Sequence, residues 1–275
     1  MSRVVVLGGS GAMGAQVCRL LRERGNDVLA ASRATGVDVC TGAGLEAALS
    51  GADTVVDCLN VVTMSRRTAV SFFAGAATRV SDAAATAGVG HIVCLSIVNV
   101  TAPAVRRLTG YYAGKAAQEQ AYAAGPVPLT LARTTAWFSL AETFLSQIRL
   151  GPLALVPGLA LQPVHPLAAA TFVADAVESG PAPTSPPSTS PTHAGPTHAG
   201  PTSTGPTSTG PTVPQLAGPQ VMDAAVMARA VASARHPGVR VTRLPIPVRG
   251  LREALLPEPG VPQDQRTFEE WLTQA

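Results

Sequence analysis

Short, almost wholly apolar segments alternate along the first half of the chain with segments whose apolar residues recur at helical spacing. The first strand is predicted at Arg3–Leu7 and the first helix at 14–24. Further strands are predicted at 28–31, 54–59, 91–97 and 129–132, and further helices at 45–49, 69–87, 110–124 and 140–149. Strands this apolar are buried on both faces, which is typical of a parallel sheet between two layers of helices. The sequence therefore predicts a doubly wound α/β fold.

The regular alternation stops after Leu150, where proline-rich segments begin. Four tandem pentapeptides, PTHAG, PTHAG, PTSTG and PTSTG, fill residues 191–210. Because this stretch has no charge and almost nothing to bury, we expect a flexible insertion over 181–213. Residues 1–180 then form the α/β domain, and 214–275 form a small C-terminal subdomain that closes over it. Later elements are predicted as helices at 167–178, 223–234 and 267–272 and as a strand at 239–244.

The composition excludes several classes of protein. Basic residues are scattered, the net charge is only +3 and aromatic residues make up 4% of the chain, which argues against a nucleic-acid surface. Four widely spaced cysteines form no metal-ligand pattern, so no metal site is expected. The apolar run at the N-terminus is too short for a signal peptide, and no later run is long enough for a membrane span. We expect a cytoplasmic protein that binds a small molecule, and the oligomeric state stays open.

Glycines follow the first strand in the pattern G-x-x-G-x-x-G, at Gly8, Gly11 and Gly14. Residues without side chains allow a tight turn between strand and helix, and they let a pyrophosphate approach the positive end of the helix. A strand before the glycines and a helix after them is the context that a dinucleotide fingerprint requires. Residues 1–180 are therefore predicted to be an NAD(P)-binding Rossmann domain.

The end of the second strand bears on which dinucleotide binds. Ser32 and Arg33 stand where an acidic residue would bind the ribose of NAD, and an arginine there can accept the 2′-phosphate of NADP. Asp38 and Val39 follow at a spacing suited to the adenine, although Asp38 could instead cap a turn. The sequence therefore favours NADP over NAD.

Tyr111 and Lys115 form Y-x-x-x-K on a predicted helix, a spacing that puts both side chains on one face. Lys115 is the only lysine of the chain, whose other basic residues are all arginine. A phenol with a pKa of about 10 exchanges protons poorly at neutral pH unless a nearby cation stabilises the phenolate, and Lys115 can supply that cation. Ser96 ends the strand HIVCLS, where ligands bind in doubly wound sheets, and could orient a substrate carbonyl or merely satisfy a backbone group.

Six motifs resemble those of the short-chain dehydrogenase/reductase superfamily, in particular its atypical or extended branch with NmrA-like and NAD(P)-dependent epimerase/dehydratase-like proteins. They are LGGSGAMG, ASR, VVDCLN, CLSIV, YYAGK with Gln118 and Glu119 behind it, and LARTTAWF. The resemblance implies that Tyr111 is the general acid/base, that Lys115 lowers the pKa of Tyr111 and binds the ribose, and that Ser96 positions the substrate. The expected cofactor contacts are Gly8, Ser10, Gly11, Ala12, Met13, Gly14, Ser32, Arg33, Asp38, Val39, Leu59, Asn60, Lys115 and Thr134.

These residues together predict an NAD(P)-dependent oxidoreductase that moves hydride between the nicotinamide and a small carbonyl or alcohol substrate. Two alternatives stay open: an epimerase or dehydratase that uses the cofactor transiently, and a non-catalytic NmrA-like regulator that senses NADP. A small hydrophobic ketone, aldehyde or quinone would fit the expected pocket. That pocket is predicted from the loop 98–109, Trp137, Phe138, Phe144 and the C-terminal subdomain.

Overall fold

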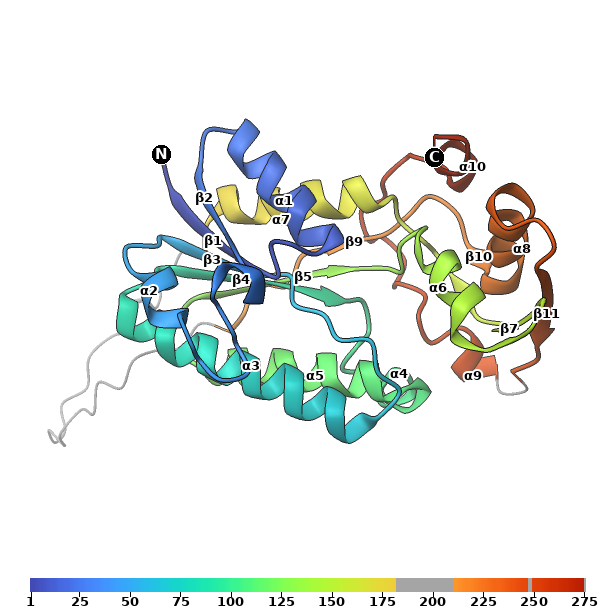
Figure 1. Ribbon diagram of the computed structural model, residues 1–275, viewed down its shortest axis with the longest axis horizontal. Helices are drawn as coiled ribbons and strands as arrows, with labels where there is room; N and C mark the ends of the chain where they lie inside the picture. The colour runs from blue at the N-terminus through green and yellow to red at the C-terminus, as the bar shows by residue number, and fades with distance from the viewer. Residues whose placement is uncertain (182–209, 247–248, 275) are drawn as a thin grey trace, which may run out of the picture.

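A parallel sheet lies at the centre of the computed structural model, which describes residues 1–181, 210–246 and 249–274 (Figure 1). Its strands are arranged in the order β2-β1-β3-β4-β5-β9, and each neighbouring pair is parallel. They are β1 (Arg3–Leu7), β2 (Asp27–Ala31), β3 (Thr54–Asp57), β4 (His91–Ile97), β5 (Leu129–Thr134) and β9 (Gln215–Leu216). The predicted doubly wound α/β fold is confirmed.

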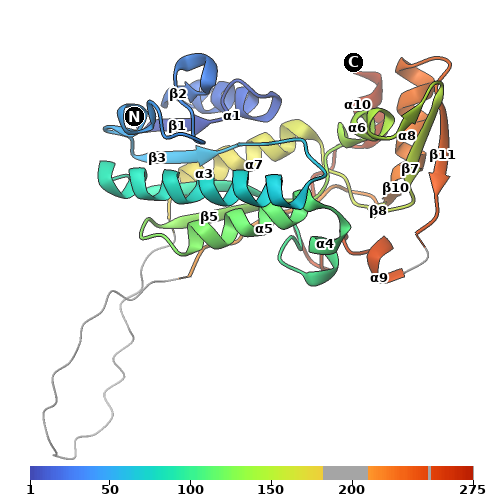
Figure 2. The ribbon, with the colours of Figure 1, turned by 60° about the horizontal axis from the view of Figure 1, so that its bottom comes forward.

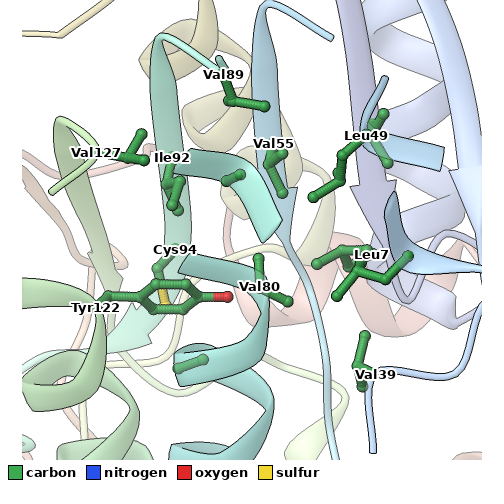
Figure 3. Packing of buried hydrophobic residues seen from close by; sticks show 14 of the residues in the cluster. Leu7, Val39, Leu49, Val55, Val80, Val89, Ile92, Cys94, Tyr122 and Val127 are labelled. Carbon is green, nitrogen blue, oxygen red and sulfur yellow. The ribbon is translucent and has the colours of Figure 1, made fainter. Parts of the chain in front are cut away.

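Helices cover both faces of this sheet (Figures 1 and 2). They are α1 (Ala12–Glu23) and α7 (Pro166–Ser179) on one face, and α2 (Leu45–Leu49), α3 (Arg66–Ala87) and α5 (Gly110–Ala123) on the other. Successive strand residues point to opposite faces, so Val4 and Val6 join the core under α1 and α7. Val5 and Leu7 join the core under α3 and α5, part of which Figure 3 shows. Burial on both faces explains why these strands are mostly apolar rather than alternately apolar and polar.

The order of the strands fixes the position of the crevice in this sheet. From β1 the chain first adds β2 on one side and then adds β3 on the other side. In doubly wound sheets, ligands bind outside the carboxyl ends of the strands at such a switch point. The glycine turn after β1 and residues 58–60 after β3 border this position.

A smaller second unit lies beyond the carboxyl ends of the strands, at the right of Figure 1. Its elements are α6 (Leu140–Gln147), β6 (Arg149–Leu150), β7 (Leu153–Pro157), β8 (Ala160–Leu161), β10 (Met222–Asp223), α8 (Ala224–Arg235), β11 (Arg240–Leu244), α9 (Arg249–Arg252) and α10 (Phe268–Thr273). β7 pairs in parallel with β11, and apolar residues of 138–161 and 222–272 share one core. Residues 138–161 therefore pack with the C-terminal part of the chain, although the predicted boundary placed them within 1–180.

Several short elements occur where the sequence predicted loops, among them a helix and a strand. The helix α4 (Pro103–Leu108) is short and begins with a proline, which suits the first turn of a helix. The strand β7 ends at Pro157, where the missing N–H interrupts no further pairing. Of the predicted insertion 181–213, residues 182–209 lie outside the described residues, whereas Thr212 accepts a hydrogen bond from the Leu131 amide at 2.7 Å. Among the described helices, none is long and apolar enough to cross a membrane.

Candidate functional site

The glycine turn between β1 and α1 is tight because Gly8, Gly9 and Gly14 leave no room for a side chain. Gly8 adopts a φ of +74°, and its amide donates to the Ala31 carbonyl at 2.9 Å. A Cβ on Gly8 would lie 2.9 Å from the Cys58 carbonyl oxygen, and a Cβ on Gly14 would lie 2.2 Å from the Gly8 oxygen. Gly8 therefore permits the turn and the approach of β3, while Gly14 permits α1 to pack against the turn.

The first turn of α1 offers unsatisfied backbone donors to the crevice. Gly11 is the N-cap of this helix, and no side chain caps it. Ser10, Gly11 and Ala12 are exposed, whereas Met13 is buried in the core. Free amides at a helix N-terminus bind anions, and the absence of a side chain at Gly11 leaves space for a group to approach them. This cradle suits the pyrophosphate of a dinucleotide.

Arg33 follows β2 as the first residue of a short 3₁₀ helix, η1 (Arg33–Thr35). Its side chain is exposed, and it forms no ion pair with any described residue. Ser32 is half-buried, and its backbone amide donates to Thr35 Oγ1 at 2.8 Å. The Arg33 guanidinium is therefore available to an anion at the end of β2.

The other residues expected at the adenine end divide into buried and exposed positions. The Asp38 carboxylate accepts a hydrogen bond from the Cys40 amide at 2.8 Å, so Asp38 does cap a turn. Val39 is buried in the core under α2 and α3. After β3, Leu59 is half-buried and Asn60 is exposed.

Ser96, Tyr111 and Lys115 come from the carboxyl end of β4 and from the first half of α5. Ile92 and Cys94 point toward the core under α3 and α5, so the alternation of β4 directs Ser96 to that same side. Ser96 is 2% exposed, and its hydroxyl has no hydrogen-bond partner in the described structure. An unsatisfied buried hydroxyl costs stability, which makes it a candidate for binding an oxygen of a ligand.

Tyr111 and Lys115 both contact the ring of Phe73 from α3. The Tyr111 ring meets the Phe73 ring edge-on at 5.7 Å, and Lys115 Nζ lies 5.1 Å from the Phe73 centroid. Burial raises the pKa of Tyr111, while the Lys115 charge lowers it. The sequence predicted a lowered pKa for Tyr111, but the net direction is upward because burial outweighs the charge.

A buried hydrogen-bond network, which the sequence did not predict, fixes the position of the Lys115 side chain. Lys115 is 4% exposed, and its Nζ donates to the Leu95 carbonyl at 2.7 Å and to Gln118 Oε1. Gln118 Nε2 donates to Asp57 Oδ2 at 2.7 Å, and the Tyr122 hydroxyl donates to the same oxygen at 2.6 Å. Figure 3 shows the Tyr122 ring beside Cys94. The signal that could have found this network is the helical spacing of Lys115, Gln118 and Tyr122 together with an aspartate inside an apolar strand.

The turn after β5 contributes two hydroxyls to the same end of the sheet. Thr134 Oγ1 accepts from Trp137 Nε1 at 3.0 Å, whereas the buried Thr135 hydroxyl has no described partner. Arg133 forms a two-pronged ion pair with Glu119, with Nε 2.9 Å and Nη2 2.5 Å from the carboxylate oxygens. Thr135 was not among the predicted contacts, although it lies in the motif LARTTAWF.

The pocket expected from aromatic residues differs in part from the structure. Phe138 and Phe144 are 1% and 7% exposed and belong to the core of the second unit. They therefore do not line a pocket, contrary to the prediction, whereas Trp137 is only half-buried. A cavity of about 520 Å³ lies elsewhere, where Ser2 and His91 mark the amino ends of the strands. Among the described residues, no cluster of three or more histidine, cysteine or acidic side chains is placed to hold a metal ion.

Comparison with known proteins agrees with this geometry. Residues 4–124, which run from β1 to the end of α5, match the model of the NAD dependent epimerase/dehydratase family. No curated protein sequence matches the chain. The resemblance to the NAD-dependent epimerase/dehydratase family, which the sequence motifs predicted, is confirmed over residues 4–124.

Solved structures share the fold over almost the whole chain. A short-chain dehydrogenase/reductase superfamily protein from Agrobacterium tumefaciens, solved with bound NAD, is 15% identical with a TM-score of 0.63, covering 99% of this chain and 95% of its own. The dTDP-4-dehydrorhamnose reductase of Bacillus anthracis, in complex with NADP, is 14% identical with a TM-score of 0.64, covering 100% and 98%. The UDP-N-acetylglucosamine 4-epimerase of Bacillus cereus is 12% identical with a TM-score of 0.61, covering 100% and 97%.

Proposed function

We propose that this chain, an extended short-chain dehydrogenase/reductase-like protein of the epimerase/dehydratase type, is an NADP-dependent oxidoreductase that acts on a small carbonyl or alcohol substrate. The observation that carries the proposal is the location of three side chains at the end of β4 and on the first half of α5, which packs on β4. Tyr111 and Lys115 share the ring of Phe73, and the unpartnered hydroxyl of Ser96 points to the same side of β4. A proton donor, a fixed cation and a free hydroxyl are the groups that reduction of a carbonyl requires.

The residues of the glycine turn and of the end of β2 fit a dinucleotide. The uncapped first turn of α1 would hold the pyrophosphate, and Gly11 would let it approach. Arg33, exposed and without an ion pair among the described residues, would bind the 2′-phosphate that distinguishes NADP from NAD. When bound, the nicotinamide supplies or accepts the hydride.

The side chains of the chain then perform the proton chemistry. The Ser96 hydroxyl donates a hydrogen bond to the substrate oxygen and orients it. Tyr111 gives its phenolic proton to that oxygen in the direction of reduction and takes it back in oxidation. Lys115 stabilises the phenolate of Tyr111 against the effect of burial.

The test is hydride transfer from NADPH to a panel of small ketones, aldehydes and quinones, followed by the loss of NADPH absorbance. Tyr111→Phe should lower kcat by roughly 10²- to 10⁴-fold while NADPH still binds, because the variant removes the proton donor only. Conversion of UDP-sugars with the cofactor returned unchanged would favour the epimerase or dehydratase alternative. NADPH binding without turnover on either panel would favour the regulator alternative.

A further inference from the structure

We propose that Asp57 and Gln118 are positioning residues: the Asp57 carboxylate, acting through the Gln118 amide, keeps the Lys115 side chain charged and fixed at the candidate site. The inference rests on the proposed function for its catalytic meaning. The interaction itself can be tested without a substrate.

Asp57 is a carboxylate with no exposed surface at the end of β3. The Leu59 amide donates to Oδ1 at 2.8 Å, while Gln118 and Tyr122 donate to Oδ2 at 2.7 and 2.6 Å. Three donors therefore surround this one carboxyl group. A negative charge at this depth is stable only when it is hydrogen-bonded and balanced by a positive charge.

The balancing charge is Lys115. The Arg133 guanidinium forms a bidentate ion pair with Glu119. Arg133 therefore balances the charge of Glu119 and not that of Asp57. Gln118 joins Asp57 to Lys115, because its nitrogen donates to the carboxylate and its oxygen accepts from the ammonium. An amide held this way at both ends has one orientation, since turning it would place two donors against each other.

This arrangement has a consequence for the reaction. Burial lowers the pKa of Lys115, but Cys94, Tyr111, Asp57 and Glu119 raise it by a larger amount, so the net direction is upward. The Cys58 thiol after β3 also interacts with the Lys115 charge, and α3 adds the uncharged ring of Phe73. Without the charge on Asp57, a lysine buried this deeply would tend to lose its proton, and an uncharged amine could not stabilise the Tyr111 phenolate.

The experiment uses the single lysine of the chain. Isotope-labelled lysine gives one side-chain NMR signal, whose pH titration reports the pKa of Lys115 directly. Asp57→Asn removes the negative charge, and Gln118→Met removes the amide at similar length. The double variant Asp57→Asn with Gln118→Glu moves the charge by one side chain toward Lys115 and preserves the total. Tyr122→Phe is the matched control, because it removes one donor to Asp57 without changing charge or amide.

We expect Asp57→Asn and Gln118→Met each to lower the pKa of Lys115 by at least about one unit, a tenfold change in the ammonium to amine ratio. The double variant should restore the wild-type pKa of Lys115, and Tyr122→Phe should leave that pKa unchanged. In turnover assays, the alkaline limb of the pH profile should shift to lower pH in Asp57→Asn and should return to its wild-type position in the double variant. An unchanged lysine titration in both single variants, or no recovery in the double variant, would overturn the proposal. If wild type shows no turnover, the proposed function fails while the NMR titration still decides this inference.

Discussion

Exchanging two glycines of the same turn should separate the packing of α1 from the binding of the dinucleotide. A Cβ at Gly14 would lie 2.2 Å from the Gly8 oxygen, whereas a Cβ at Gly11 would lie 3.2 Å from the same atom. Bringing the first contact to the second distance requires a shift of about 1 Å, which is 3.2 minus 2.2. α1 cannot make this shift freely, because it buries Val17, Cys18 and Leu21 against the sheet.

The two variants should therefore differ in stability. Gly14→Ala should lower the free energy of unfolding by about 3 kcal/mol, at the upper end of overpacking costs, because a 1 Å retreat also weakens the dispersion contacts of α1. Gly11→Ala should change it by less than about 1 kcal/mol, because φ is −77° there and a slightly poorer N-cap is offset by a less flexible unfolded chain. Urea denaturation followed by circular dichroism measures both values.

The variant with the smaller effect on stability, Gly11→Ala, should have a marked effect on dinucleotide binding. Gly11→Ala should weaken NADPH binding at least tenfold, because the alanine methyl group would occupy the space through which the pyrophosphate approaches α1. Calorimetric titration of the folded variant with NADPH measures this loss. A Gly14→Ala variant as stable as wild type, or a Gly11→Ala variant with unchanged affinity for NADPH, would contradict this prediction.

Three further predictions concern buried polar side chains. Ser96→Ala should leave stability undiminished, since the hydroxyl has no partner to lose, yet should lower kcat about 10²-fold in the carbonyl assay; a loss in urea stability would contradict this. His91 has a pKa lowered from 6.5 to about 4 by burial, so the unfolded chain binds its proton first and stability should fall by up to roughly 3 kcal/mol as pH drops from 6.5 toward 4. Measured by urea denaturation, the unfolding free energy of His91→Gln should fall less steeply with decreasing pH than that of wild type. An equally steep fall would contradict a lowered pKa of His91. Glu119→Gln should destabilise the fold by about 3 kcal/mol because it strands the guanidinium of Arg133, and a shift within the error of thermal unfolding would count against a buried pair.

The parts of the fold that the sequence predicts best are those decided by local patterns. The strand His91–Ile97 is predicted without error because it is a continuous apolar run bounded by glycine and a loop, and the glycine turn has the conformation that its spacing implies. The pairing of β7 with β11 joins segments about 85 residues apart, and no local pattern announces it. In addition, Pro157 led to the prediction of a loop where β7 lies.

The candidate site shows the same division. Tyr111 and Lys115 were found because their spacing lies within one helix, whereas Asp57 comes from β3 and reaches Lys115 only through the tertiary packing of α5 on the sheet. The raised pKa of Tyr111 is likewise a result of burial, which the sequence motif does not encode. Spacing within one element predicts which groups share a face, but the environment of those groups depends on what the fold packs against them.

The proposed function depends on the binding of a dinucleotide with a 2′-phosphate by the glycine turn and Arg33. Calorimetric titration of the purified protein with NADPH and NADH, wild type beside Arg33→Ala, tests it most directly, with the exposed Arg79→Ala of α3 as a matched control. We predict tighter binding of NADPH than of NADH in wild type and in the control, and loss of that preference in Arg33→Ala, by about tenfold or more for one charged hydrogen-bonding group. Binding of neither dinucleotide, or a preference for NADPH that survives Arg33→Ala, would contradict the proposed role of the glycine turn and Arg33.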